Sequence, residues 1–170
     1  TGATLLEEIE DLVNLVYSTG NKNLTLLVCT SSYPADPAEA NLKRIATLQE
    51  KFGVSVGVSD HTLGIGVALG AIALGATVVE KHLTLSRNDL GADSAFSLEP
   101  HEFAKLVEEG KSTAASLGVP DWRISPSETE SRRLRRSLYI VQDVRAGDLV
   151  SEENLRAIRP GAGLSPKHFD

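Results

Sequence analysis

The sequence predicts an α/β fold in which parallel strands alternate with helices. Three short apolar runs, starting near Leu24, Val54 and Ala76, each lead into polar residues, as buried strands do at their ends. The intervals between them leave room for one helix each, which is the repeat of a βα unit. Because the carboxyl ends of parallel strands meet at one edge, where ligands bind in this class of fold, we expect the functional site there.

Each predicted helix has its own sequence signals. Apolar residues recur at helical spacing from Leu5 to Val16, where Thr4 fits the N-cap, Glu7 fits its capping-box partner, and Gly20 ends the region. The next helix is predicted to begin after Asp36, a plausible N-cap, with a proline at its first position. Its inward face is predicted to consist of four residues, Leu42, Ile45, Ala46 and Leu48.

The third βα unit is predicted to carry a functional loop. Small residues dominate a helix over 67–74, which indicates close packing against the sheet, and Gly75 ends it. After the third strand, residues 86–98 form a loop long enough to be functional, and a helix over 100–117 follows. Three units are too few to close a barrel, and the sequence contains no Met, so we expect a part of a larger protein.

The character of the chain changes after Gly118. Residues 119–135 are predicted to be a linker, because prolines and a charged stretch replace the apolar periodicity. Beyond it we expect a strand over 137–141, a short continuation at 149–150, and one helical turn capped by Ser151. The second unit, 136–170, is therefore expected to be small and β-rich.

Composition excludes several classes of function. The net charge of −6 gives no overall attraction to nucleic acid, and the basic run at 132–136 is too short to change that expectation. No apolar stretch reaches the ~18 residues of a membrane span and no signal peptide opens the chain, so we expect a cytoplasmic protein without a membrane partner. The single Cys29 favours a buried thiol over a nucleophile.

Two histidines at neighbouring strand ends form the candidate site. His61 and His82 could converge on one divalent metal whose remaining ligands are water and substrate. A hydrogen-bonded structural role is the alternative for both. Asp60 and Glu80 flank them, either as partners that fix a histidine tautomer or as members of a salt bridge with a neighbouring Lys81 or with Arg87.

Hydroxyl and carboxylate groups surround this pair. Ser31, Tyr33 and Ser59 are candidates for binding phosphate or sugar hydroxyls, although capping the following helices is an equally ordinary role for the serines. Asp93 lies in the long loop, where its carboxylate can reach over the strand ends to a polyol or simply form a turn.

Five motifs resemble those of the sialic acid synthase family in order and spacing. They are Cys-Thr-Ser-Ser-Tyr-Pro at 29–34, Ser-Asp-His-Thr at 59–62, Glu-Lys-His at 80–82, Asp-Ser-Ala-Phe-Ser-Leu-Glu-Pro at 93–100 and Arg-Pro-Gly at 159–161. The resemblance implies a (β/α)8 TIM barrel followed by a small antifreeze-like (SAF) domain. Residues 1–118 would then be the last three βα units of the barrel, 119–135 a linker, and 136–170 the start of the SAF domain.

The resemblance implies condensation of phosphoenolpyruvate with an amino-sugar aldehyde, which yields a nine-carbon 2-keto acid and phosphate. Arg-Ser-Leu-Tyr-Ile-Val at 136–141 and the motifs around Tyr33 and Phe96 look closer to the pseudaminic acid branch, whose sugar is a 2,4-diacetamido-2,4,6-trideoxy hexose. The alternatives are an N-acetylneuraminate synthase that uses N-acetylmannosamine and, in a different class, a non-catalytic carbohydrate-binding fragment. The missing barrel strands would make an isolated fragment inactive.

The resemblance also implies roles for individual residues. A Mn²⁺ or Mg²⁺ ion is expected on His61 and His82, where it would polarise the sugar aldehyde. These two histidines and Glu80 are the expected catalytic residues. Gly2 and Ser59 are expected to bind the phosphate, and Ser31, Tyr33 and Asp93 are expected to bind the sugar. Arg159 is also an expected substrate-binding residue. It would reach from the SAF domain into the partner subunit's barrel in a domain-swapped homodimer.

Overall fold

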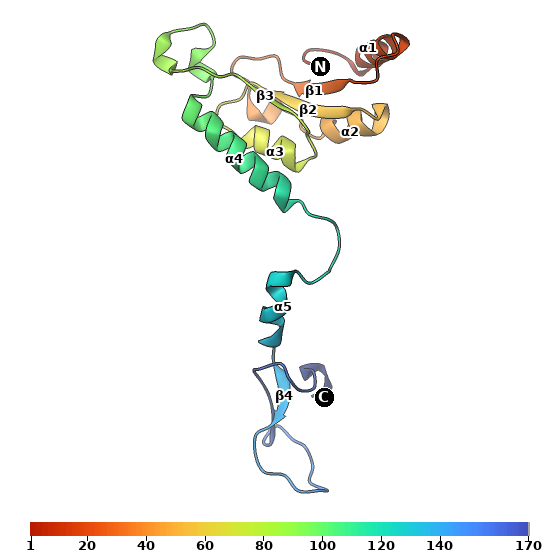
Figure 1. Cartoon of the computed structure of the whole chain (residues 1–170), viewed down its shortest axis with the longest axis vertical. Coiled ribbons are helices and arrows are strands. Elements are labelled where there is room, and N and C mark those ends of the chain that lie inside the picture. The colour runs from red at the N-terminus through yellow and green to blue at the C-terminus, as the bar shows by residue number, and fades with distance from the viewer. Residues whose placement is uncertain (170) are drawn as a thin grey trace. The chain divides into compact units, whose positions relative to one another are not determined.

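The structure is a computed structural model that describes residues 1–169 and divides into two compact units, Thr1–Gly118 and Val119–Asp170. In the first unit, helices and strands alternate along the chain (Figure 1). Its elements are α1 (Leu6–Ser18), β1 (Thr25–Cys29), α2 (Arg44–Phe52), β2 (Ser55–Asp60), α3 (Gly66–Ala73), β3 (Val79–Lys81) and α4 (Pro100–Ser116).

The three strands of the first unit form a parallel sheet in the order β1-β2-β3, which confirms the predicted βα pattern. The register pairs Cys29 with Ser59, and Ser59 with Glu80, so the three strands end at the same edge. β3 begins later than predicted, because the backbone N–H of Ala76 still donates to Ala71 in α3. The polar residues that follow the strands therefore share one edge.

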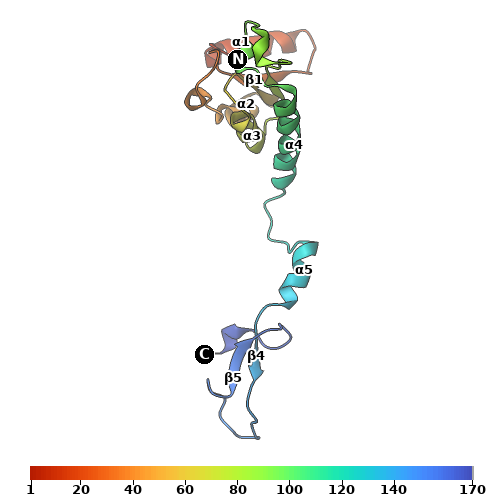
Figure 2. The same ribbon diagram turned by 90° about the vertical axis from the view of Figure 1, so that its left-hand side faces the viewer.

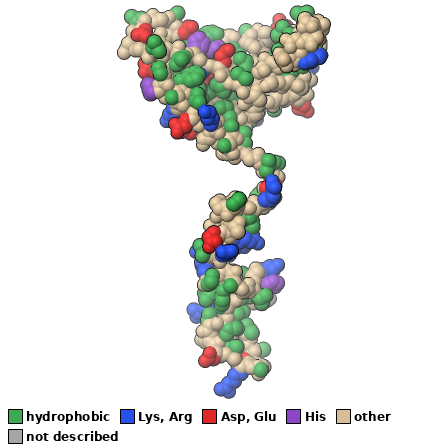
Figure 3. Space-filling view, viewed as in Figure 1, with side chains coloured by type: hydrophobic (Ala, Val, Ile, Leu, Met, Phe, Trp, Pro, Cys, Tyr) green, Lys and Arg blue, Asp and Glu red, His purple; other side chains and the backbone are tan. Residues whose placement is uncertain are grey.

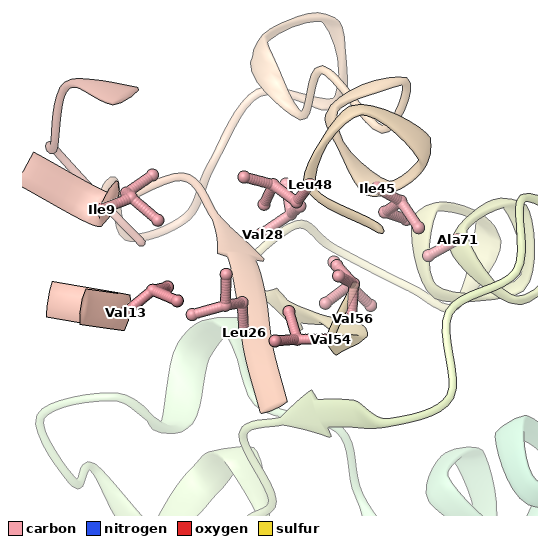
Figure 4. Close-up of a cluster of buried hydrophobic side chains, with 10 residues drawn as sticks. Ile9, Val13, Leu26, Val28, Ile45, Leu48, Val54, Val56 and Ala71 are labelled. Atoms are coloured by element: carbon pink, nitrogen blue, oxygen red, sulfur yellow. The ribbon is translucent and has the colours of Figure 1, made fainter. Parts of the chain in front are cut away.

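One face of this sheet carries the hydrophobic core. Figure 4 shows side chains of α1, β1, α2, β2 and α3 meeting there, among them Val56, Ile45 and Ala71. Val54, Val56 and Val58 point into the core because alternate residues of a strand face the same side. Ile45 and Val56 are completely buried, and burial of each such side chain contributes about 1.5–3 kcal/mol. The residues between these valines face the opposite side.

Two helix starts differ from the prediction. Leu5, not Thr4, is the N-cap of α1, because Glu8 rather than Glu7 accepts the cap's backbone N–H at 2.6 Å. Thr4 instead donates its hydroxyl to the carbonyl of Thr1.

Asp36 caps a separate 3₁₀ turn, Pro37–Glu39, rather than the long helix that the sequence predicted. Asn41 then adopts a positive φ of 47°, which breaks the helical path, so α2 begins only at Arg44. Ala46 is exposed, contrary to expectation, whereas Ile45 and Leu48 are buried as predicted.

The second unit holds α5 (Pro126–Arg133), β4 (Ser137–Ile140) and β5 (Leu155–Ile158). β4 and β5 are antiparallel and lie side by side in Figure 2, with Tyr139 opposite Arg156. The span predicted as a linker, 119–135, contains the helix α5, whose start is fixed by a capping box between Ser125 and Glu128. The strand predicted at 149–150 is absent from the described residues, and Leu155 begins β5 instead of ending a helical turn.

Candidate functional site

Four rings gather at the carboxyl edge of the sheet. The ring centroids of His61 and His82 lie 5.2 Å apart, and the ring of Tyr33 lies 4.3 Å from His61. Phe96, which the sequence analysis did not select, lies 5.0 Å from His82 and 5.7 Å from Tyr33. Histidine side chains are visible at the surface of the first unit in Figure 3. The two predicted histidines therefore converge, and the site is open to solvent beside them.

His61 is held by its own strand end and by the end of β1. Its Nδ1 lies 2.9 Å from the carbonyl oxygen of Thr30. A carbonyl only accepts hydrogen bonds, so Nδ1 carries the proton and Nε2 keeps its lone pair. The Ser59 hydroxyl oxygen lies 3.4 Å from Nε2, and this hydroxyl donates its own proton to Glu80. With only 7% of the residue exposed, the His61 ring is held in one orientation.

Glu80 and Ser59 form a cross-strand pair on the site face of the sheet. The register places them opposite each other, and the Ser59 hydroxyl donates to Glu80 Oε1 at 2.7 Å. Glu80 therefore does not form the alternative salt bridge with Lys81, because Lys81 is paired with Asp60 instead. Arg87 is paired with Glu102 of α4. Of the two carboxylates that flank the histidines in the sequence, Glu80 thus lies on the site face of the sheet and Asp60 on the other face.

The long loop returns Asp93 to His82. Leu98 N–H donates to the His82 carbonyl and Thr84 N–H donates to the Leu98 carbonyl, both at 2.9 Å, so the loop closes against the end of β3. Asp93 Oδ2 then lies 3.5 Å from Nδ1 of His82. A carboxylate at Nδ1 favours the tautomer whose Nε2 is free, as at His61. The His82 side chain is 31% exposed, so the ring is partly accessible to solvent.

The first residues of the chain pack against the end of β1. The Thr1 amino group donates to the Leu27 carbonyl at 3.0 Å, and a Cβ on Gly2 would collide with the Ser31 hydroxyl and come within 3.0 Å of Cys29 Sγ. Gly2 is therefore a position where backbone approaches the site closely. Cys29 is half-buried rather than fully buried, and its Sγ lies 3.9 Å from His61 Nδ1, which is already engaged by Thr30.

Arg159 belongs to the second unit and directly follows β5. The carbonyl of the following Pro160 accepts a hydrogen bond from the Tyr139 hydroxyl at 2.8 Å, which ties this segment to β4. All the other predicted site residues belong to the first unit and gather at its strand ends. Arg159 alone comes from elsewhere in the chain.

The two histidines fit a cation site with few protein ligands. Among residues 1–169, no cluster of three or more His, Cys, Asp or Glu side chains is arranged to hold a metal. His61 and His82 remain, with rings inclined at 78° and both Nε2 atoms free of a strong hydrogen bond. Two imidazoles can bind one ion and leave the other positions to water and substrate, which is the arrangement of a catalytic rather than a structural metal.

The comparison with protein families identifies both units. The NeuB family model matches residues 1–121, and the SAF domain model matches residues 135–170. These matches confirm the predicted fold class, a portion of a TIM-barrel-type α/β domain followed by a SAF domain. No described helix is both long enough and apolar enough to cross a membrane.

Individual relatives cover nearly the whole chain. A pseudaminic acid synthase of Helicobacter pylori is 38% identical over 99% of this chain and 50% of its own length. An N,N'-diacetyllegionaminic acid synthase of Campylobacter jejuni is 40% identical over 100% of this chain and 52% of its own length. The solved N-acetylneuraminic acid synthetase of Leptospira borgpetersenii is 39% identical with a TM-score of 0.70, covering 76% of this chain and 45% of that protein. The chain thus spans about half the length of the curated relatives it matches.

Proposed function

The chain belongs to the NeuB family, and from that membership we propose that the whole protein condenses phosphoenolpyruvate with an amino-sugar aldehyde to form a nonulosonic acid and phosphate. The observation that carries the proposal is the convergence of His61 and His82 at the carboxyl edge of the sheet. The half of the relatives that has no counterpart in this chain would supply the remaining strands and site residues.

We propose that His61 and His82 hold a divalent cation through their Nε2 atoms. When bound, the cation supplies Lewis-acid chemistry that polarises the aldehyde oxygen of the sugar. Imidazole nitrogens favour Mn²⁺ over Mg²⁺, because Mg²⁺ prefers an all-oxygen shell. The protein's own part is orientation, in which the Thr30 carbonyl fixes His61 and the Asp93 carboxylate lies beside His82.

The surrounding residues suit the two substrates. Ser59 and the backbone near Gly2 lie at the strand ends where a phosphate of phosphoenolpyruvate would be bound, and Glu80 holds the Ser59 hydroxyl in place. Tyr33 is 54% exposed and Asp93 is also exposed, so both are available to sugar hydroxyls. Ser31, exposed beside them, is a further proposed sugar contact.

The proposed sugar is the 2,4-diacetamido-2,4,6-trideoxy hexose of the pseudaminic acid branch, supported by the Helicobacter pylori relative. The precursor of diacetyllegionaminic acid is a second candidate, because the Campylobacter jejuni relative of that name is 40% identical over the whole chain. N-acetylmannosamine, the substrate of an N-acetylneuraminate synthase, is the third. The proposed location of the reaction is the cytoplasm.

The metal assignment is tested by replacing each histidine of the whole protein. His61→Ala and His82→Ala should each abolish phosphate release from phosphoenolpyruvate in the presence of sugar, while circular dichroism shows an unchanged fold. His101→Ala is the matched control, since its side chain is 76% exposed on α4 and its ring is not among the four rings that gather at the site. Near-normal rates in either site variant would exclude the metal role.

We propose that Arg159 of one subunit completes the site of a partner subunit in a homodimer. Arg159→Ala should raise the KM for the sugar more than it lowers kcat, because a binding contact is lost. Mixing Arg159→Ala subunits with His61→Ala subunits tests the exchange. Hybrid dimers regain one intact site if Arg159 acts across the dimer, whereas an activity no higher than that of the separate variants would show that it acts within its own subunit.

A further inference from the structure

A buried ion pair lies next to the two histidines in the sequence, on the other face of the sheet. Lys81 Nζ lies 2.8 Å from Asp60 Oδ2, and the two side chains are 1% and 0% exposed. The other carboxylate oxygen, Oδ1, accepts the backbone N–H of Thr62 at 2.9 Å and its hydroxyl at 2.7 Å. Lys81 also donates to the Thr62 carbonyl. Both charged groups therefore have hydrogen-bond partners within the protein.

The strand register places this pair on the face opposite the site. Ser59 lies beside Glu80, and Asp60 lies beside Lys81, in consecutive rungs of the β2–β3 ladder. Because side chains alternate along a strand, the Ser59–Glu80 pair faces the histidines while the Asp60–Lys81 pair faces the helices. The Asp60–Lys81 pair cannot touch substrate from there. Its influence must pass through the backbone.

That backbone carries both proposed metal ligands. His61 lies between Asp60 and Thr62, which are joined by two hydrogen bonds, and His82 directly follows Lys81. The cross-strand contacts of Lys81 with Asp60 and Thr62 thus fix the two histidine-bearing segments relative to each other.

Stability alone is a weak reason for such a pair, because well-packed apolar residues usually stabilise a buried site as much or more. We propose that Asp60 and Lys81 are positioning residues that set the separation of His61 and His82, and through it the affinity for the divalent cation. This inference rests on the proposed metal site.

The test is Mn²⁺ affinity, measured on the whole protein from the paramagnetic resonance signal of free Mn²⁺ during titration. Asp60→Asn and Lys81→Met should each weaken binding by about 10–100-fold, the usual effect of losing a residue that orients a metal ligand. Two controls separate this from general destabilisation. Lys51→Met removes a lysine from the exposed pair with Glu10, and Ile45→Val loosens the buried core; both should bind Mn²⁺ as the wild type does.

A double variant, Asp60→Asn with Lys81→Met, distinguishes positioning from the burial of an unpaired charge. It removes the cross-strand ion pair but keeps an acceptor at residue 60 for Thr62. Its melting temperature should exceed those of the single variants, because no lone charge is buried, while Mn²⁺ binding stays weak. Recovery of wild-type affinity in the double variant would overturn the positioning role.

Failure of the metal site itself has a different signature. If the wild type binds no Mn²⁺, or His61→Ala binds it as tightly as the wild type, the proposed cation site is wrong and the positioning role falls with it. If the wild type and His61→Ala differ as expected but Lys81→Met retains full affinity, only the positioning role is overturned.

Discussion

Gly57 is a position in β2 where even one methyl group has no room. A Cβ there would lie 2.7 Å from Leu27 Cδ2 and 2.9 Å from Val78 Cβ, and it would also press on the Val78 carbonyl oxygen. Carbon atoms normally approach no closer than about 3.5 Å, so the overlap approaches 1 Å. Leu27 can turn aside, but the Val78 carbonyl is fixed by the hydrogen bond it accepts from Val58 N–H at 2.9 Å.

Gly57→Ala should therefore move the β3 strand away from β2. Overpacking of this kind lowers the free energy of unfolding by about 1–3 kcal/mol, measurable by urea denaturation. Because Ser59–Glu80 and the two histidines depend on the same strand pairing, binding of Mn²⁺ at the proposed site should weaken in parallel. The variant tests the sheet and the site together.

Gly66→Ala is the matched control for this substitution. Gly66 is the first residue of α3, and apart from its chain neighbours and the backbone of its own helix no heavy atom lies within 4 Å of the position of its Cβ. The same added methyl group should there leave stability unchanged or raise it by up to about 1 kcal/mol. The packing account of β2 is refuted if Gly57→Ala is as stable as the wild type and keeps its metal affinity.

Two further substitutions test the core and a helix start. Ile45→Ala should lower the free energy of unfolding by about 2–5 kcal/mol in urea titrations, because Ile45 is completely buried in the core; a loss below 1 kcal/mol would contradict that packing. The Glu99 backbone N–H donates a hydrogen bond to the Glu102 carboxylate and, aided by Arg87, lowers the pKa of Glu102 from its ordinary value of 4.5. The ionised Glu102 carboxylate therefore stabilises the fold above pH 4.5. This stabilisation is lost as the pH falls through the lowered pKa. The stability difference between wild type and Glu102→Gln should accordingly be largest above pH 4.5 and shrink as the pH falls below that value, and a pH-independent difference would contradict this role.

Much of the first unit could be predicted because its signals are local. The alternation of Val54, Val56 and Val58 was sufficient to locate β2 and its buried face, and Gly53 ends α2 with a positive φ as a helix terminator does. The start of α1 was misplaced by one residue, because Thr4 and Leu5 both have a glutamate three positions later. Only the structure shows which of the two pairs closes.

The second unit was harder to predict for two physical reasons. Helix α5 has no apolar stripe, so its charged residues resemble a linker, although the pair of Ser125 and Glu128 is a capping-box signal. Strand β5 is four residues long, and its partner β4 lies well before it in the sequence. A short strand with a distant partner leaves little trace in local periodicity.

The location of the site could be predicted from the sequence, but the contacts within it could not. Its location followed from topology, because polar residues at the ends of neighbouring parallel strands must share an edge. The pairing of Glu80 with Ser59 and of Lys81 with Asp60 depended on strand register, which the sequence left open. Phe96 lies beside His82 because the long loop folds back, and a long loop carries no local signal of where it returns.

Phosphate release from phosphoenolpyruvate by the whole protein is the most direct test of the proposed condensation reaction. The pseudaminic acid precursor, the diacetyllegionaminic acid precursor and N-acetylmannosamine are offered separately, with Mn²⁺ and again after chelation. We expect phosphate release with the pseudaminic acid precursor, and we expect chelation to abolish it. Release with another of these sugars would reassign the substrate, and no release with any of them would contradict the proposed activity.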